Sequence, residues 1–391
     1  MFEAGIDEPL IFRLFLRTAA YFDAYLKAYL SVDGEASRNI AEIVHNDATR
    51  FLNANLDILE RRFKEFDIDD MKTEVKGRVF VPFGPAAGFD KNGDLLEPFS
   101  RVFGFLKPGT VVVPYREGNK APRIDVDHVL ENIDNAQGFP SEGLEYFLAK
   151  LILYRQNELP RGVRKPVYAS ICGIPPSPDK MNQAYKEMEI LIANLLPYVD
   201  GFEWNPFSPN TASLQMLRTP EHFEATARFI HEMAGEDILK LVKMGPYRTE
   251  EERKESFRLA EAWMKGGGDG FTVVNTLKVP KNWPYGSAGR SGRDLTGYMI
   301  KAVTDLRREF PESVISATGG IFDPYLAYTL FRDDDKKVNM VEGYTPYTFY
   351  GLGLAKLLMY GVLLRMKRGG YQNMTELQRR VATSQTSSGR S

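Results

Sequence analysis

The spacing of apolar residues divides the chain into an N-terminal part with a helical pattern and a longer part in which short apolar runs alternate with helical stretches. From Pro9 to about Phe66 the apolar residues recur with a helical period, and no segment has the pattern of a strand. The segment Leu10–Leu30 is apolar over most of its circumference, which fits a core helix or a helix lying in a membrane interface. The segment from about Ser37 to Arg62 is more evenly amphipathic. We therefore expect a helical extension over residues 1–70.

From Arg78 onward the pattern predicts eight strands, at Val79–Phe83, Phe105–Val113, Val167–Ile171, Gly201–Trp204, Leu239–Val242, Gly270–Val274, Val314–Ala317 and Asn339–Glu342. Helical patterns follow most of them, notably at Pro178–Leu196, Pro220–Met233, Glu250–Lys265, Leu295–Arg308, Pro324–Phe331 and Gly351–Met366. Eight strands with intervening helices over roughly 290 residues predict an α/β fold, a (β/α)8 TIM barrel. An open doubly wound sheet is the alternative, and it is disfavoured because no Gly-x-Gly-x-x-Gly turn follows the first strand. We place the barrel at residues 77–370 and a polar tail at 371–391.

Composition narrows the functional classes. With 391 residues, 43% of them hydrophobic and 26% charged, the chain is typical of a globular protein and long enough for one large barrel plus an extension. The net charge of -2 gives no sign of a nucleic-acid partner. The single cysteine, Cys172, rules out a disulfide framework, and the four scattered histidines predict no bound metal. The acidic start of the chain predicts no signal or transit peptide, and no apolar run reaches the roughly 18 residues of a spanning helix.

Polar and small residues follow the predicted strands. In a barrel the carboxyl ends of the strands face the active site, so these residues are expected to converge. The loop Asn205–Thr211 holds two amides, two hydroxyls and two prolines. Its prolines make it stiff, and its amides can each donate and accept hydrogen bonds, which suits a planar ligand edged with carbonyl and N–H groups. A capped turn before the helix near Thr219 is the alternative interpretation of this loop.

Two further features point to a cofactor. The usual phosphate site of a barrel lies after the seventh and eighth strands, where this chain has Gly319–Gly320 and the turn Tyr344–Thr345. A tight turn explains the glycine pair equally well. Lys91 and Lys243 end two other strands, and each could face a ring that becomes anionic on reduction or lie at the surface. A phosphate site, two lysines and amides, without a catalytic carboxylate pair or a metal cluster, favour a flavin mononucleotide (FMN) enzyme.

Several separated motifs, in order, resemble those of the class 2 dihydroorotate dehydrogenases. They are Gly84–Gly93, Gly118–Arg123, Asn135–Phe139, Ser208–Thr211, Gly289–Arg293, Gly319–Gly320 and Tyr344–Thr345. The resemblance covers about residues 77–370, and the N-terminal helical extension also resembles class 2. It implies FMN-dependent oxidation of (S)-dihydroorotate to orotate in de novo pyrimidine biosynthesis, with electrons passed to a quinone. It also implies that the N-terminal helices face the quinone and contact the membrane peripherally, on the cytoplasmic face of a bacterial inner membrane, in an otherwise cytoplasmic protein.

The resemblance also implies residue roles. Ser208 resembles the catalytic base that takes the C5 proton while C6 gives hydride to flavin N5. The implied substrate contacts are Lys91, Asn135, Phe139, Asn205, Asn210, Asn275 and Thr276. Thr211 and Phe139 match positions along the proton path. The implied flavin contacts are Ala86, Ala87, Gly88, Lys91, Gly109, Thr110, Ser170, Lys243, Ser291, Gly292, Gly319, Gly320, Tyr344 and Thr345.

The chain departs from the family pattern mainly on the flavin edge and the acceptor side. Ser170 stands where the family has an asparagine, Pro140 replaces an amide, and Val126 replaces a common arginine. These departures leave open a related FMN oxidoreductase with another cyclic-amide substrate or a soluble electron acceptor. A catalytically silent barrel is a third interpretation, and it conflicts with the presence of Ser208, Lys91 and most of the amides.

Overall fold

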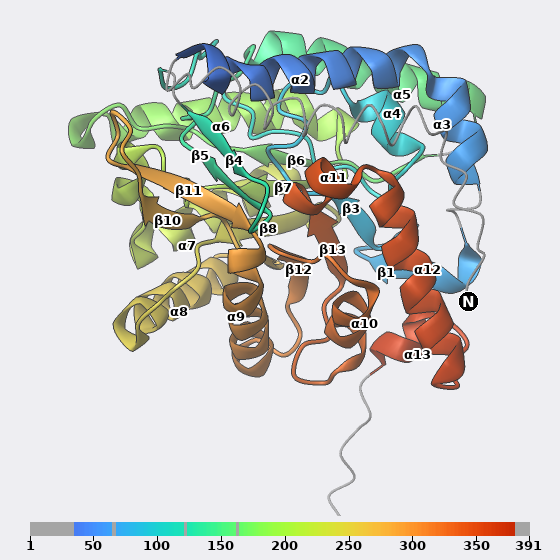
Figure 1. Ribbon diagram of the computed structural model, residues 1–391. Coiled ribbons are helices and arrows are strands. Elements are labelled where there is room, and N and C mark those ends of the chain that lie inside the picture. Colours follow the sequence, from blue (N-terminus) through green and yellow to red (C-terminus); the bar gives the residue numbers. More distant parts are fainter. Residues whose placement is uncertain (1–34, 65–67, 121–122, 162–163, 380–391) are drawn as a thin grey trace, which may run out of the picture.

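The computed structural model describes residues 35–64, 68–120, 123–161 and 164–379 (Figure 1). The predicted helix Leu10–Leu30 and the polar end of the chain, residues 382–391, lie outside these residues.

Seven parallel strands form the central sheet, in the order β3 (Phe83–Pro85), β13 (Met340–Gly343), β12 (Val314–Thr318), β9 (Gly270–Val273), β8 (Leu239–Met244), β7 (Gly201–Trp204) and β6 (Tyr168–Ile171). The first strand of this sheet along the chain pairs with the last, with Val341 opposite Phe83. An open doubly wound sheet would keep these strands apart, so the pairing confirms the predicted barrel.

The first two predicted strands are corrected by the structure. The run Val79–Phe83 is divided: β2 (Arg78–Phe80) forms a hairpin with β1 (Thr73–Val75), and the barrel strand begins only at Phe83. The run Phe105–Val113 contains no regular strand and forms isolated bridges with β6 and the residue before it, Leu106 with Val167 and Val111 with Ile171. Pro82 and Pro108 interrupt the two runs, and because proline has no N–H it cannot continue a ladder. The second segment still closes the barrel between β3 and β6, since the Gly104 N–H donates to the Phe83 carbonyl at 2.9 Å.

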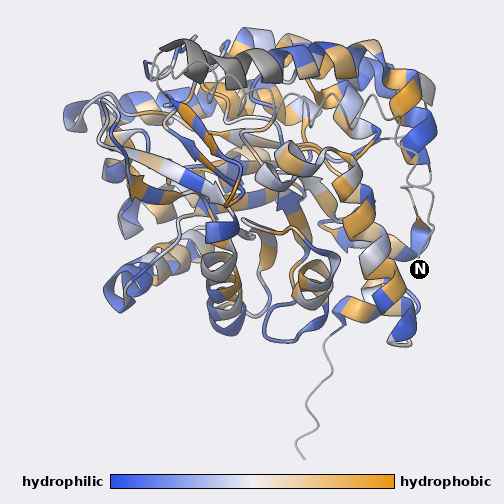
Figure 2. Cartoon of the chain, in the orientation of Figure 1, coloured by the Kyte–Doolittle hydropathy of each residue, from blue (hydrophilic) through white to orange (hydrophobic). Residues whose placement is uncertain are grey.

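The predicted helices after the later strands are confirmed, with small changes of boundary. They are α6 (Met181–Leu195), α7 (Pro220–Ala234), α8 (Glu250–Lys265), α9 (Thr296–Glu309), α10 (Pro324–Arg332) and α12 (Gly353–Arg368). Helix α8 begins at a capping box in which Thr249 and Glu252 bond each other's backbone N–H groups, which accounts for its sharp start. Figure 2 shows apolar and polar residues alternating along these helices, as expected when one side packs on the sheet.

Other helices were not predicted individually. They are α4 (Leu96–Ser100), α5 (Leu144–Arg161), α11 (Thr345–Tyr350) and α13 (Met374–Gln378), and 3-10 turns occur at Asp69–Met71, Pro178–Lys180, Leu196–Tyr198, Ala212–Leu217 and Arg293–Leu295. Met374 and Leu377 of α13 are buried, so the beginning of the expected polar tail packs on the protein.

A second sheet and the first described helix of the extension cover one end of the barrel. The sheet is antiparallel and runs β10 (Leu277–Pro280), β11 (Ser287–Gly292), β5 (Asn132–Asn135) and β4 (Ile124–Asp127). The predicted helical segment 37–62 folds as α2 (Glu35–Ala54) and α3 (Leu56–Phe63), and α2 contacts β4 (Figure 1). In the part of the chain that the structure describes, none of the helices has the length and apolar character needed to cross a membrane.

The barrel interior changes in character along its axis. An apolar cluster, which we call the barrel plug, fills one end and consists of Val75, Phe80, Phe105, Tyr168, Leu239, Leu241 and Met340. The main core lies outside it, between the strands and the surrounding helices. Toward the carboxyl ends of the strands the interior becomes polar, and it opens into a pocket.

Candidate active site

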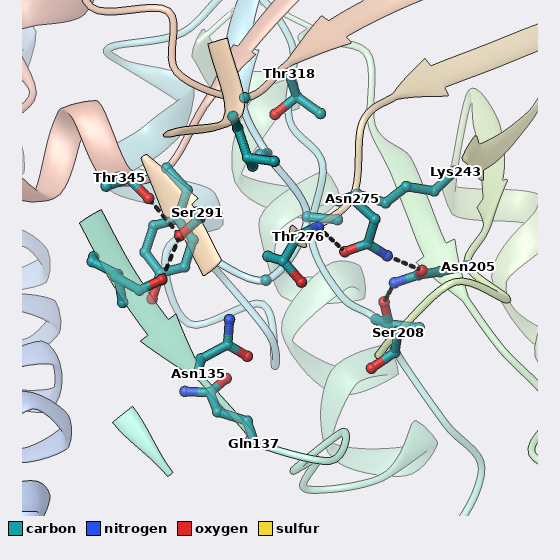
Figure 3. A pocket seen from close by; sticks show the side chains of 18 of the residues that line it. Asn135, Gln137, Asn205, Ser208, Lys243, Asn275, Thr276, Ser291, Thr318 and Thr345 are labelled. Atoms are coloured by element: carbon teal, nitrogen blue, oxygen red, sulfur yellow. Dashed lines mark hydrogen bonds between the residues drawn. The ribbon is translucent and has the colours of Figure 1, made fainter. Parts of the chain in front are cut away.

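The carboxyl ends of the barrel strands and the second sheet enclose a pocket, which we call the barrel-mouth pocket (Figure 3). Its empty volume is about 1100 Å³, part of it open to solvent. The lining includes most of the residues singled out in the sequence, namely Ala86, Ala87, Gly88, Lys91, Thr110, Asn135, Phe139, Asn205, Ser208, Asn210, Lys243, Asn275, Thr276, Ser291, Gly292, Gly319, Gly320, Tyr344 and Thr345.

A chain of hydrogen bonds fixes the amides on one side of the pocket. Asn275 Nδ2 donates to the side-chain oxygen of Asn205, Oδ1, at 3.0 Å (Figure 3). Asn205 Nδ2 in turn donates to the Thr110 hydroxyl at 2.8 Å. The backbone N–H of Thr276 donates to Asn275 Oδ1 at 2.8 Å. These bonds fix the orientation of each side-chain amide, and so determine where its NH2 group and its oxygen lie. The pocket therefore presents preset polar groups to a ligand.

The Ser208 loop is held from two sides. Asn210 donates to Asn135 Oδ1 at 3.0 Å, and Asn135 in turn donates to the Gly289 carbonyl of β11 at 3.0 Å. The Asn210 backbone N–H lies 3.4 Å from Ser208 Oγ, so the serine oxygen can accept a long hydrogen bond. The loop thus connects the barrel to the second sheet, with the serine hydroxyl at the pocket surface.

Arg218, which the sequence analysis did not identify, supports this loop from behind. Its guanidinium donates to the carbonyl oxygens of Pro206 at 3.0 Å and Ser208 at 3.2 Å, and it lies over the Phe207 ring. Burial lowers the pKa of Arg218 to about 10, which still leaves it cationic at neutral pH. A fixed cation near the Ser208 loop favours negative charge on groups of that loop.

Glycines and hydroxyls line another part of the pocket. Gly320 has a φ of +71°, and a Cβ there would come within 2.2 Å of Thr296 Oγ1, so a side chain is excluded at this wall. Thr345 donates to Ser291 Oγ at 2.8 Å, and Ser291 donates to the Ile133 carbonyl at 3.2 Å (Figure 3). Close backbone approach beside hydroxyl groups is the arrangement that a phosphate requires.

The two predicted lysines differ in their surroundings. Lys243 on β8 is only 5% exposed, and its Nζ lies 3.9 Å from Glu203 Oε1. The Lys91 ammonium donates to the Gly88 carbonyl at 3.1 Å and lies where the pocket meets a second cavity. Both lysines therefore reach the pocket surface, and Lys243 does so from the barrel interior.

Three predicted site residues do not line the pocket. Ser170 is fully buried and its hydroxyl bonds to that of Thr110 at 3.0 Å, so it reaches the pocket only through Thr110. Gly109 and Thr211 also lie outside the lining, and Thr211 Oγ1 is buried with no hydrogen-bond partner in the described part of the chain. Residues that line the pocket without having been predicted include Gln137, Pro140, Thr318 and Glu342. Their position at the ends of β5, β12 and β13 is the signal that could have identified them.

A second cavity lies under α2, and we call it the α2 cavity. Its empty volume is about 1880 Å³, part of it open to solvent. Ala48, Thr49 and Leu52 of α2 form one side, with Phe89 and Tyr344 opposite. The rings of Phe89 and Tyr344 are stacked, 4.8 Å apart. Charged residues, among them Arg116, Glu117 and Glu142, also line this cavity.

Comparison with known proteins connects this arrangement to one family. Residues 70–328 match the family model described as Dihydroorotate dehydrogenase. A Dihydroorotate dehydrogenase (quinone) from Rhodospirillum rubrum is 30% identical over 77% of this chain and 81% of its own length. One from Nitratiruptor sp. is 27% identical over 91% of this chain and 97% of its own length. The crystal structure of DHODH from Eimeria tenella in complex with ferulenol has the same fold, with a TM-score of 0.72 at 23% identity over 86% of this chain and 94% of that one.

Proposed function

The chain belongs to the dihydroorotate dehydrogenase family, and on this premise we propose that it oxidises (S)-dihydroorotate to orotate in de novo pyrimidine biosynthesis and passes the electrons to a quinone. The observation that carries the proposal is the barrel-mouth pocket, which is lined both by interlocked amides and by Ser208. One edge of the dihydroorotate ring carries alternating carbonyl and N–H groups, which can form hydrogen bonds with such amides.

FMN fits the residues of this pocket. Gly320 leaves no room for a Cβ, and at Gly319 the φ of +120° disfavours a side chain. Ser291 and Thr345 offer hydroxyls beside this wall, which suits the phosphate. Lys243 and the small residues Ala86 and Ala87 would lie along the ring system. Bound in this pocket, FMN would supply a hydride acceptor for C6 of the substrate and a carrier of electrons to the second acceptor.

Ser208 is proposed to take the C5 proton of the substrate as its own hydroxyl proton passes to solvent along the path predicted at Thr211 and Phe139. The C5–C6 double bond then forms as C6 gives up its hydride to the flavin. The long bond from the Asn210 N–H and the cation of Arg218 behind the loop both favour negative charge on the serine oxygen. Asn135, Asn205 and Asn275 would hold the ring in line, which matters because a misplacement of about 1 Å can cost roughly a hundredfold.

The α2 cavity is the proposed quinone site, since it adjoins the barrel-mouth pocket at Lys91 and Tyr344. The helical extension would then face the membrane surface, peripherally and at the cytoplasmic side. A soluble acceptor is the second candidate. The charged lining at Arg116, Glu117 and Glu142 favours it, because an apolar quinone tail gains nothing from ionised groups.

The test is anaerobic mixing of the purified protein with L-dihydroorotate while the visible absorbance of oxidised flavin is recorded. Rapid bleaching is the expected result. A yellow protein that does not bleach would point to another substrate, and a colourless protein would contradict the FMN assignment. Reoxidation of the bleached protein by a short-chain quinone, compared with a soluble dye, then separates the two acceptor candidates.

A further inference from the structure

Below the barrel-mouth pocket, between it and the barrel plug, charged side chains fill the barrel interior. We call this group the charged layer, and it consists of Lys107, Glu203, Lys243 and Glu342. Lys107 and Glu203 are 0% exposed, Glu342 is 1% exposed and Lys243 is 5% exposed. The interior of a TIM barrel is ordinarily packed with branched apolar residues, so four buried charges are unusual in this position.

Lys107 is the centre of the charged layer. Its ammonium donates to Glu203 Oε2 at 2.9 Å and to Thr272 Oγ1 at 3.0 Å, and it also bonds to Glu342 Oε1. Burial opposes the ionisation of Glu203, but the charges of Lys107 and Lys243 outweigh it and lower the pKa of that carboxyl. Burial, followed by the charge of Glu203, raises the pKa of Glu342 despite the nearby lysines.

Stability alone does not account for these charges. Removing an ion from water costs several kcal/mol, and well-packed apolar residues in place of a buried ion pair are often as stable or more so. A buried cluster that is continuous with a ligand pocket is instead typical of groups that act on the ligand.

The charged layer is continuous with the barrel-mouth pocket at two points. Lys243 and Glu342 both line the pocket, and Lys243 Nζ lies 3.9 Å from Glu203 Oε1 below it. The second oxygen of Glu342, Oε2, is buried and has no hydrogen-bond partner within the described residues. The pocket floor therefore carries an ammonium held from beneath by a carboxylate, next to a carboxyl oxygen that can bond a ligand.

We propose that the charged layer positions Lys243 against the flavin ring and sets the reduction potential of the flavin, with Glu203 holding that potential down. This inference rests on the proposed function, because it requires FMN in the barrel-mouth pocket. Reduction adds negative charge to the ring, and Lys243 stabilises that charge. Glu203 partly neutralises Lys243, and in a water-poor interior the effect of such a charge is only weakly screened.

The experiment measures the two-electron midpoint potential of FMN bound to the full-length protein, by equilibration with reference dyes. Glu203→Gln keeps the side-chain volume and removes the negative charge. We expect it to shift the equilibrium toward reduced flavin by about tenfold, equivalent to about 30 mV for a two-electron couple. Glu342→Gln should shift it the same way by less, because among the described residues Lys243 forms its ion pair with Glu203 and not with Glu342.

The matched control is Glu158→Gln. Glu158 is a buried carboxyl in α5 that accepts hydrogen bonds from Tyr154 and Arg155, outside the barrel, so its loss affects stability without changing the field in the pocket. An unchanged or lowered potential in Glu203→Gln would overturn the inference. If that variant does not fold, an unchanged or lowered potential in Glu342→Gln overturns it as well.

The outcomes separate this inference from the proposed function. Wild-type protein that holds no flavin would contradict the FMN assignment and the inference together. Wild-type protein that bleaches with dihydroorotate, alongside a Glu203→Gln variant with unchanged potential, would leave the proposed function standing and overturn the charged-layer inference alone.

Discussion

The barrel-mouth pocket and the α2 cavity adjoin each other and share a wall, yet they are built differently. The shared wall consists of Lys91, Ile124, Ile133, Gln137, Pro140 and Tyr344. In the barrel-mouth pocket the polar groups come from strand ends and bond one another, as in the chain from Asn275 through Asn205 to Thr110. The α2 cavity is closed on one side by a helix and lined by aromatic, aliphatic and charged residues.

The difference fits the two tasks that we propose for these cavities. A reacting ring must be held in one orientation, and strand ends with interlocked amides provide that rigidity. An electron acceptor needs only to approach the flavin and leave again, which a larger cavity under a helix permits. Changes in one cavity should therefore affect one half-reaction and leave the other intact.

The largest expected effect lies in the barrel-mouth pocket. Ser208→Ala should retain FMN but slow flavin bleaching by dihydroorotate about 100- to 10,000-fold, the usual contribution of a positioned base. Stopped-flow absorbance under anaerobic conditions measures this rate. Reoxidation by quinone should stay at the wild-type rate, because the serine does not line the α2 cavity.

The control for this variant is Ser213→Ala, a serine in the 3-10 turn that follows the same loop and lies outside the pocket lining. It should bleach like wild type. Bleaching of Ser208→Ala at the wild-type rate would remove Ser208 from the mechanism.

A smaller effect, on the other half-reaction, is expected from a substitution in the α2 cavity. Ala48→Trp places a large ring where α2 lines this cavity, so we expect quinone reoxidation to slow by about tenfold or more, equivalent to about 1.4 kcal/mol. Flavin reduction by dihydroorotate should not change. The same rates measured on Ala54→Trp, at the exposed end of α2, provide the matched control. Equal quinone rates in both variants would contradict the acceptor role of the cavity.

The sequence could predict strands and helices whose buried residues form an unbroken pattern or whose ends carry clear capping signals. The strand Gly201–Trp204 has the predicted bounds, because each of its residues is buried and the pattern is unbroken. Helix Glu250–Lys265 also has the predicted bounds, because a capping box and a following glycine mark its ends. The first two barrel strands were misplaced because Pro82 and Pro108 divide apolar runs whose pairing depends on distant neighbours.

The candidate site was predictable where residues follow strands directly. Lys243, Asn275 and Ser208 end strands or follow them, so barrel geometry alone brings them to one end. Lys107 and Glu203 lie within apolar runs, and their inward direction depends on register, which the pattern of one chain does not specify. Arg218 reaches the Ser208 loop only because the turn Ala212–Leu217 folds back, which no local signal indicated.

The remaining prediction concerns stability rather than rate, and it involves Asp90 in the wall of the α2 cavity. Unlike Glu203, Asp90 has no ion-pair partner among the described residues, and it accepts the Leu95 N–H at 3.1 Å. Burial, with a contribution from Asp94, raises the pKa of Asp90 to about 7, although the neighbouring backbone N–H groups oppose this. An unfolded aspartate has a pKa of about 3.9. Between these values the native protein holds a proton that the unfolded chain has released.

The sign of the pH dependence follows from this difference. Unfolding releases the Asp90 proton across this window, so the contribution of Asp90 to stability falls as pH rises, by up to about 1.4 kcal/mol per pH unit. Asp90→Asn carries no such proton, so its free energy of unfolding should fall less steeply than that of wild type between about pH 4.5 and about pH 6.5. Urea unfolding across that range measures both slopes, and Asp237→Asn at an exposed position is the control. Parallel slopes in wild type and Asp90→Asn would mean that this wall carries an ionised carboxylate. The α2 cavity would then hold one more charge beside its aromatic wall, which would favour a soluble acceptor over an apolar quinone.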